Sequence, residues 1–90
     1  MSTKVVIAEA FRVASGGIDE IETHGKTIGE CLEEAVKKAP ALQNIWFKPE
    51  GGLSKYVILT VNGENVPIHN LGQAVKDGDE IYPILLIGGG

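Results

Sequence analysis

The sequence predicts an α+β fold in which a mixed sheet of four to five strands curls over one main helix. Three observations support this fold class. One segment with helical periodicity lies near the middle of the chain, runs of β-branched and aromatic residues lie on both sides of it, and glycine-containing turns separate those runs. At 90 residues the chain has the length of a single domain.

The first element expected is a hairpin. Lys4–Phe11 is rich in β-branched and aromatic residues and predicts a strand, and Ile18–Thr23 predicts a second, more polar strand. Residues 15–17 (Ser-Gly-Gly) give a turn signal between the two. The chain is therefore expected to open with two antiparallel strands.

The main helix is expected to begin at Thr27. Thr27 and Glu30 match a capping box, in which the hydroxyl and the carboxylate each satisfy a backbone N–H left free at the helix start. Pro40 ends the helical pattern. Cys31 lies on the apolar side and is interpreted as a small packed residue, because no histidine lies at a local catalytic spacing. The apolar stripe of this helix consists of Ile28, Cys31, Leu32, Ala35, Val36 and Ala39.

A connector over residues 41–54 follows the helix. Within it, Trp46 and Phe47 are expected to close one end of the core, because large aromatic side chains are usually mostly buried; an exposed docking patch is the alternative. Tyr56–Val61 is apolar at consecutive positions and predicts a central strand covered on one side by the helix.

The last third of the chain predicts a second hairpin and a final strand. Asn62-Gly63 is a strong signal for a two-residue turn, and residues 64–67 are expected to return as a brief edge strand that tolerates Pro67. Residues 69–75 are expected to form a short helical turn. The Asp-Gly-Asp turn at residues 77–79 then leads into the final strand.

Composition and charge exclude several classes of function. The net charge of −4 argues against a nucleic-acid partner, which would need a clustered basic face. Cys31 is the single cysteine, so the chain is not a disulfide-stapled secreted scaffold, and a reducing cytoplasm is the expected setting. No apolar run is long enough for a signal-peptide core or a membrane span.

The titratable residues do not predict a catalytic or metal site. His24 and His69 have no companion ligands at metal spacing, and a zinc site needs three or four. Turn chemistry accounts for the carboxylates of Asp77, Asp79 and Glu80. We therefore expect no metal, no bound cofactor and no catalytic dyad, and we do not expect the chain to be an enzyme.

The end of the chain is the candidate functional segment. An apolar strand leads into Gly88, Gly89 and Gly90, which have no side chain that packing could hold. We expect a domain over residues 1–87 and a flexible tail over residues 88–90. Such a tail would carry the carboxylate of Gly90 on a sterically bare arm that fits the narrow active-site channel of another protein.

The apolar strand before the glycines is also a candidate docking element. Residues 84–87 (Ile-Leu-Leu-Ile) cannot all face the core if one side of the sheet is open. Exposed apolar patches mark interaction sites. Leu85 and Ile87 are therefore the predicted partner-docking residues.

Several of these segments together resemble the MoaD/ThiS family of ubiquitin-like β-grasp sulfur carriers. The resemblance rests on residues 61–66 (VNGENV), Leu71, residues 77–81 (DGDEI) and the apolar strand that ends in Gly89 and Gly90. It covers nearly the whole chain. One departure is that many members carry a proline shortly before the two glycines, whereas Leu85 stands there in this chain and the proline is Pro83.

The resemblance implies a β-grasp fold and a role for Gly90. A ubiquitin-activating-type enzyme would use ATP to adenylate its carboxylate, which would then become a thiocarboxylate and donate sulfur to a biosynthetic synthase. Gly89 is the second glycine of the pair, and Gly88 stands where the family has a small, variable residue. A ubiquitin-like modifier, joined to lysine through the same glycine, is the alternative.

Details of the chain resemble one part of that family more than others. The long connector from Pro40 to Ser54, and Phe11-Arg12 followed by residues 16–17 (Gly-Gly), are similar to CysO-like carriers and archaeal small modifier-like proteins. This similarity implies sulfur transfer for cysteine or a related metabolite, with molybdopterin synthesis as the next possibility.

Overall fold

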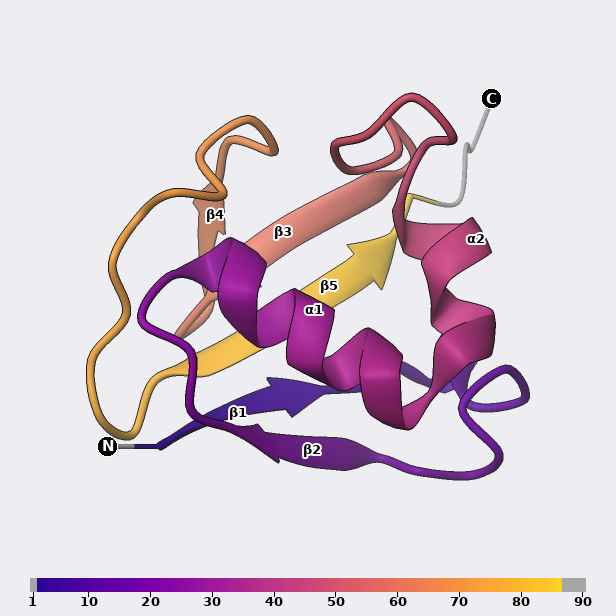
Figure 1. Ribbon diagram of the computed structural model, residues 1–90, viewed down its shortest axis with the longest axis horizontal. Coiled ribbons are helices and arrows are strands. Elements are labelled where there is room, and N and C mark those ends of the chain that lie inside the picture. The colour runs from indigo at the N-terminus through magenta and orange to yellow at the C-terminus, as the bar shows by residue number, and fades with distance from the viewer. Residues whose placement is uncertain (1, 87–90) are drawn as a thin grey trace.

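The computed structural model describes residues 2–86 and contains a five-stranded sheet with helix α1 packed across one face (Figure 1). The strand order is β2-β1-β5-β3-β4, in which β1 and β5 run parallel and the other neighbours run antiparallel. This mixed sheet confirms the predicted α+β class. The elements are β1 Thr3–Val6, β2 Glu20–Thr23, α1 Ile28–Lys38, α2 Gln43–Trp46, β3 Val57–Val61, β4 Glu64–Val66 and β5 Glu80–Leu85.

The opening hairpin is confirmed, but its first strand is shorter than predicted. β1 ends at Val6, and residues Glu9–Phe11 form a 3-10 helix that turns Phe11 into the core, where it is 1% exposed. The rings of Phe11 and Trp46 meet edge to face, with centroids 5.9 Å apart. The strand prediction was wrong beyond Val6 because this turn depends on a contact with a distant residue, which local composition does not encode.

Helix α1 begins as the sequence predicted. The Oγ1 of Thr27 accepts the backbone N–H of Glu30 at 3.2 Å. The carboxylate of Glu30 accepts the N–H of Lys26 at 2.8 Å, one residue before the N-cap. Cys31 is fully buried on the inner side of α1, and its Sγ lies 3.1 Å from the Oγ1 of Thr3, which confirms that it is a packed residue.

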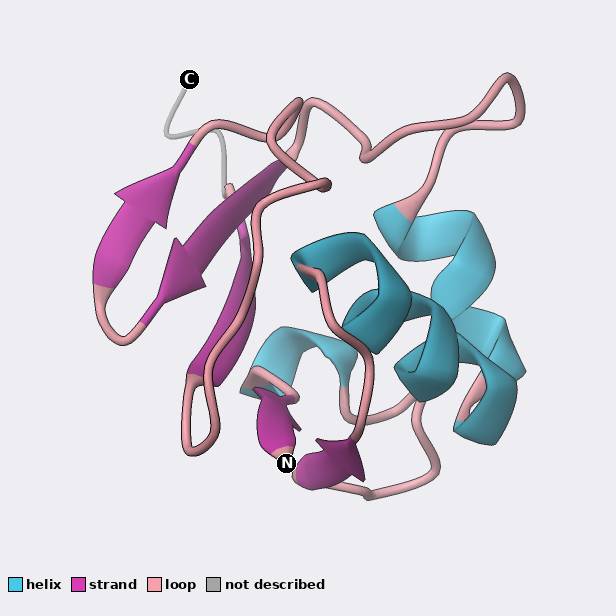
Figure 2. Ribbon diagram, turned by 60° about the vertical axis from the view of Figure 1, so that its left-hand side comes forward, coloured by secondary structure: helices cyan, strands magenta, loops and turns pink. Residues whose placement is uncertain are grey.

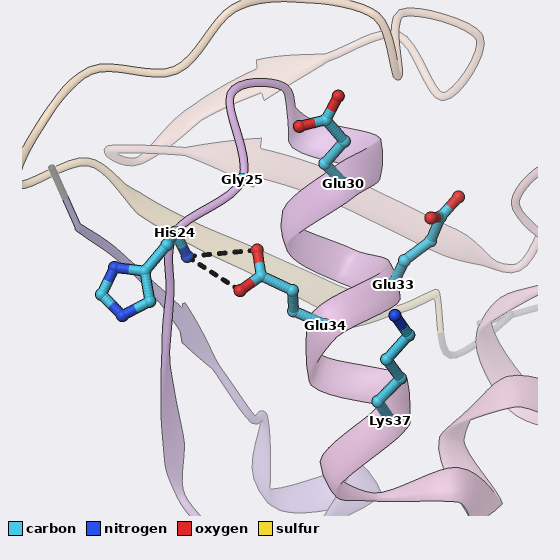
Figure 3. Close-up of a pocket in the computed structure, with 6 residues that line it drawn as sticks. All are labelled: His24, Gly25, Glu30, Glu33, Glu34 and Lys37. Carbon is cyan, nitrogen blue, oxygen red and sulfur yellow. Dashed lines mark hydrogen bonds between the residues drawn. The ribbon is translucent and has the colours of Figure 1, made fainter.

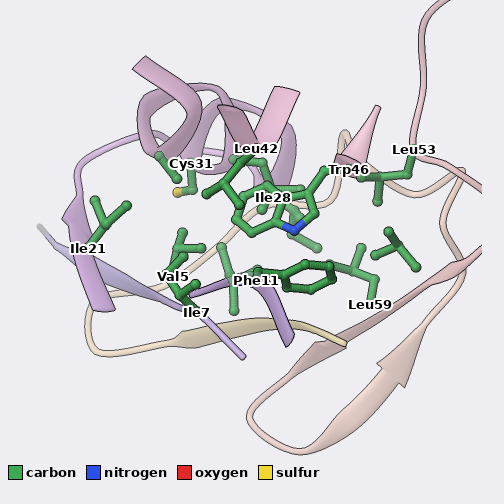
Figure 4. Packing of buried hydrophobic residues seen from close by; sticks show 14 of the residues in the cluster. Val5, Ile7, Phe11, Ile21, Ile28, Cys31, Leu42, Trp46, Leu53 and Leu59 are labelled. Carbon is green, nitrogen blue, oxygen red and sulfur yellow. The ribbon is translucent and has the colours of Figure 1, made fainter. Parts of the chain in front are cut away.

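The core lies between α1 and the sheet and is closed at one end by α2 (Figure 4). Trp46 is fully buried and Phe47 is partly buried against the same cluster, so the predicted core role of both aromatic residues is confirmed. The Nε1 of Trp46 is buried and has no hydrogen-bond partner among the described residues. Figure 4 draws that nitrogen on the side of the indole that faces Phe11, whose ring can act as a weak acceptor for an N–H donor.

The second hairpin is also confirmed. Asn62 and Gly63 both have positive φ, at 53° and 84°, as a type I′ turn requires. β4 is a three-residue strand at the sheet edge, and Val66 is its last paired residue before Pro67.

The predicted helical turn at residues 69–75 is absent from the structure. This segment instead supplies backbone acceptors to the start of α1: the O of Leu71 accepts the N–H of Gly29 at 2.8 Å, and the O of Gln73 accepts the N–H of Ile28 at 3.0 Å. The first N–H groups of a helix have no partner inside the helix. Residues 70–73 form a turn in which the N–H of Gln73 donates to the O of Asn70 at 3.0 Å, and Ala74 then pairs with Thr27, which leaves the carbonyls of Leu71 and Gln73 free to accept from α1.

None of the helices in residues 2–86 is long and apolar enough to cross a membrane. The predicted boundary between a domain over 1–87 and a tail over 88–90 lies outside the described residues and stays a prediction.

Candidate functional site

The candidate site is the place where the chain leaves the sheet at the end of β5. β5 lies between β1 and β3, and its register with β3 pairs Leu85 with Val57. Beyond the strand, the N–H of Leu86 donates to the O of Tyr56 at 2.6 Å. Leu86, the last described residue, is therefore hydrogen-bonded to the residue that precedes β3, and this bond holds it beside the start of that strand.

β5 accommodates Pro83 although it lies between two neighbouring strands. The N–H of Asn62 donates to the O of Glu80 at 2.8 Å, so the even-numbered residues of β5 exchange hydrogen bonds with β3. The nitrogen of Pro83 therefore faces the β1 side, where the pairing ends at Ile81. The missing N–H removes no bond to β3 and coincides with the end of the parallel ladder.

The start of β5 is locked by the two turns that carry the family resemblance. The Nδ2 of Asn62 donates to the Oδ1 of Asp79 at 2.9 Å, and the Oδ1 of Asn62 accepts the N–H of Glu80 at 2.9 Å. The N–H of Lys76 donates to the other carboxylate oxygen of Asp79 at 2.8 Å. The bond from Lys76 and then the bond from Asn62 lower the pKa of Asp79 below its usual value of 3.8. Asp79 thus holds the two turns together as an ionised acceptor.

Among residues 2–86, no helix lies on the face of the sheet opposite α1 (Figure 2). Because side chains alternate along a strand and Ile81 and Pro83 are buried, Tyr82, Ile84 and Leu86 lie on this open face. Tyr82 is 37% exposed and Leu86 is 46% exposed. We define the open-face patch as these residues with their neighbours on and beside β3: Tyr56, Ile58, Tyr82, Ile84 and Leu86.

The predicted docking residue Leu85 lies on the other face of the sheet, where it is half-buried against the core. Its docking role stays a prediction, and so does that of Ile87, which lies outside the described residues together with Gly88, Gly89 and Gly90. Tyr56 and Tyr82 were not predicted from the sequence as surface residues of this face. Side chains alternate between the two faces of a strand, so the sequence could have indicated both tyrosines only if it were known which alternate positions are buried.

Away from β5, a surface depression lies between α1 and the segment after β2, with a volume of about 310 Å³ (Figure 3). Both carboxylate oxygens of Glu34 accept the backbone N–H of His24 there, at 3.0 and 3.1 Å. No group of three or more His, Cys, Asp and Glu side chains within residues 2–86 is placed to hold a metal ion. β1 separates this side of the sheet from β5, so the depression is not part of the tail site. Its lining residues are His24, Gly25, Glu30, Glu33, Glu34 and Lys37.

Comparisons with known proteins agree with this fold. The chain is similar to SAMP1 from Haloferax volcanii, with 25% identity, a TM-score of 0.86 and 100% of each chain covered. It is similar to a chain of the BexX/CysO complex of Amycolatopsis orientalis, with 27% identity, a TM-score of 0.84, and 98% of this chain and 99% of that chain covered. The small archaeal modifier protein 1 of Methanosarcina acetivorans is 26% identical, with a TM-score of 0.84, and 99% and 96% of the two chains are covered.

The comparison with curated proteins finds no match. The sequence profile of the ThiS family matches residues 5–90, which is almost the whole chain. This match agrees with the structure, which has the β-grasp arrangement of one main helix across a mixed five-stranded sheet. It also agrees with the two hydrogen-bonded turns before β5. The chain therefore belongs to the ThiS family, within the wider MoaD/ThiS group of ubiquitin-like carriers and modifiers.

Proposed function

We propose that this protein is a sulfur carrier whose reacting group is the carboxylate of Gly90. A ubiquitin-activating-type enzyme uses ATP to adenylate that carboxylate, and a sulfur donor then displaces AMP to leave a thiocarboxylate. A carboxylate is a poor electrophile, and the phosphate leaving group makes acyl substitution feasible. The observation that carries the proposal is the family match, which extends to residue 90 and includes Gly89 and Gly90.

The fold supports this proposal by fixing the base of the tail. Four residues follow Leu86, and an extended segment of that length spans at most about 14 Å. Leu86 itself is hydrogen-bonded to Tyr56. A partner that binds the sheet near Leu86 can therefore receive the carboxylate of Gly90 up to about 14 Å from Leu86. The last three residues inside the partner's channel would then be glycines.

Deletion of Gly89 and Gly90 tests the proposal. The shortened chain should fold with an unchanged melting temperature, because glycines have no side chain to contribute to the core, and it should lose all adenylation in an ATP–pyrophosphate exchange assay. Gly72→Ala, at an exposed glycine outside the left-handed region where an added Cβ meets open space, gives a control that keeps the end of the chain intact. Exchange activity that persists after the deletion would contradict the role of Gly90.

The partner enzyme is proposed to dock on the open-face patch, with contributions from Leu85 and Ile87. Exposed apolar surface of this kind marks interaction sites, and this surface lies at the base of the tail. Leu86→Arg should raise the KM for the carrier on the order of tenfold, with an unchanged melting temperature. Leu85→Ala decides the role of its neighbour: a raised KM supports docking through Leu85, and an unchanged KM removes it from the surface.

The sulfur acceptor is proposed to be a synthase that makes cysteine or a related metabolite, with a molybdopterin synthase as the next candidate. The similarity to a chain of the BexX/CysO complex supports the first, because the resemblance to CysO-like carriers is the one that implies sulfur transfer for cysteine. The thiocarboxylated protein should be offered to both types of synthase in single-turnover reactions. The acceptor that returns Gly90 to a carboxylate identifies the pathway.

A modifier function is the second candidate, and the similarity to SAMP1 over the full length of both chains favours it. In that case the activated carboxyl group of Gly90 forms an isopeptide bond with a lysine of another protein. Immunoblotting of a tagged chain in its host distinguishes the two products. A ladder that disappears after deletion of Gly89 and Gly90 supports the modifier, and its absence together with a thiocarboxylate supports the carrier.

A further inference from the structure

Lys55 lies beside the base of the tail and is the basic residue next to the open-face patch. It precedes Tyr56, whose carbonyl accepts the N–H of Leu86 at 2.6 Å. The Nζ of Lys55 lies 5.3 Å from the centroid of the Tyr56 ring, within the range of a cation–π contact. Tyr56 is 56% exposed, so the positive charge stands over an aromatic surface that is open to a partner.

The other charges on the open face are arranged differently. Lys4, on β1, pairs with Glu20 on β2 at 3.7 Å. The β1–β2 half of this face therefore contains a paired lysine and glutamate. The β3–β5 half carries Glu80 at the start of β5 and Lys55 beside the other end of that strand, and no carboxylate of residues 2–86 lies within 4 Å of Lys55.

We infer that Lys55 determines the specificity of the carrier for its adenylating enzyme, by pairing with a carboxylate on the enzyme surface that covers the open-face patch. This inference rests on the proposed function. A protein that binds Tyr56 and Leu86 brings its own surface against the ammonium group of Lys55, and removing that group from water without a counter-charge is unfavourable. The matching enzyme surface is thus apolar, with an acidic residue opposite Lys55.

The net charge of the chain makes this local charge informative. At −4, the whole chain attracts basic surfaces at long range, and such attraction would not distinguish one basic protein from another. A single uncompensated lysine at the docking site selects against a basic residue at that position of the partner. Selection by an unfavourable like-charge contact is a common source of specificity.

Lys55 does not act on the reacting group. Four residues separate Leu86 from the end of Gly90 in the sequence, and they extend into the enzyme in the proposed reaction. Lys55 is therefore a docking residue, and its substitution should change the KM for the carrier and leave kcat unchanged.

The test compares Lys55→Glu and Lys55→Met with Lys37→Glu, which makes the same charge change on the exposed side of α1. Each variant is assayed by ATP–pyrophosphate exchange with an adenylating enzyme that acts on the wild-type chain. Lys55→Glu should raise KM on the order of tenfold at low salt, with unchanged kcat and melting temperature, and Lys37→Glu should match the wild type. Raising the salt concentration should weaken wild-type binding more than that of Lys55→Met.

The outcomes separate this inference from the proposed function. A wild-type chain that is adenylated while Lys55→Glu keeps the wild-type KM overturns the role of Lys55 and leaves the carrier function intact. An unchanged KM with impaired sulfur transfer to the acceptor also overturns it, because Lys55 would then face the synthase. A wild-type chain that no adenylating enzyme accepts contradicts the proposed function itself.

Discussion

Asn62 belongs to the sequence segment that resembles the family, and the structure shows what its side chain does. Its positive φ forms the β3–β4 turn, and its side-chain amide bonds both Asp79 and the N–H of Glu80. The sequence predicted the turn because Asn-Gly is a local signal. It did not predict the bonds to Asp79, which bring together residues 17 positions apart. Only the sheet register creates that contact.

The lowered pKa of Asp79 predicts a pH-dependent contribution to stability. A carboxyl group with a folded-state pKa below its unfolded value stabilises the fold above the unfolded pKa and loses that contribution as the pH falls through the folded pKa. The wild type should therefore be more stable than Asp79→Asn at pH 7, and the difference should shrink as the pH falls below about 4. Urea unfolding of both proteins between pH 7 and pH 2.5 measures it. A difference that is constant over this range would show that Asp79 does not act through its charge.

Asn62→Gly removes the side-chain bonds of Asn62 to Asp79 and Glu80 without straining the backbone, since glycine tolerates the positive φ. Loss of the two side-chain bonds should lower the free energy of unfolding by about 1 kcal/mol. Gly63 should be left unchanged, so that the turn itself is preserved. No loss of stability in urea unfolding would contradict the proposed role of the Asn62 side chain.

Substitutions of Phe11 and Val13 test the 3-10 helix at Glu9–Phe11, which the sequence did not predict. Phe11 is buried against Trp46, whereas Val13, two residues later, is 95% exposed. Phe11→Ala should lower the free energy of unfolding by about 3–5 kcal/mol, and Val13→Ala should change it by less than about 0.5 kcal/mol. Equal effects of the two substitutions in urea unfolding would show that the 3-10 helix does not seal the core.

At the scale of elements, α1 covers the core and also protects the edge strand β2. The N–H of His24 donates to the carboxylate of Glu34, and the Nζ of Lys38 donates to the O of Glu22 at 3.4 Å. These are the outward-facing backbone groups at the end of β2, because the inward-facing residues pair with β1. An unprotected edge strand is a template for pairing with another chain.

Removal of this protection should promote self-association. The double variant Glu34→Ala, Lys38→Ala is expected to associate at lower protein concentration than the wild type in light scattering. The matched control is Glu33→Ala, Lys37→Ala, which removes the same charges from neighbouring positions of α1 and breaks no described bond to β2. If both double variants behave alike, the strand edge is not what Glu34 and Lys38 protect.

The elements also show how far sequence reasoning extends in this protein. α1 was predictable because its cap, its apolar stripe and its terminating proline are all local signals. Residues 69–75 were not, since their conformation is set by the unpaired N–H groups of α1, more than 40 positions earlier in the chain. The proposed docking face was predictable only in part, because an apolar run such as residues 84–87 does not reveal which of its residues face outward.

At the scale of the whole molecule, the fold separates stability from function. The helices of the described residues lie on one side of the sheet (Figure 2). The core lies on that side as well, while the open-face patch, with Lys55 beside it, lies on the other. β5 connects the two, because its residues alternate between the core and the open face. A partner can therefore bind the patch and receive the tail without disturbing the core.

The sulfur-carrier function is best tested by intact mass spectrometry of the chain after incubation with a ubiquitin-activating-type enzyme, ATP and a sulfide source. We expect the mass gain for exchange of one oxygen for one sulfur, with fragmentation that assigns the change to Gly90. An unchanged mass, with an enzyme proven active on its own carrier protein, would contradict the sulfur-carrier function.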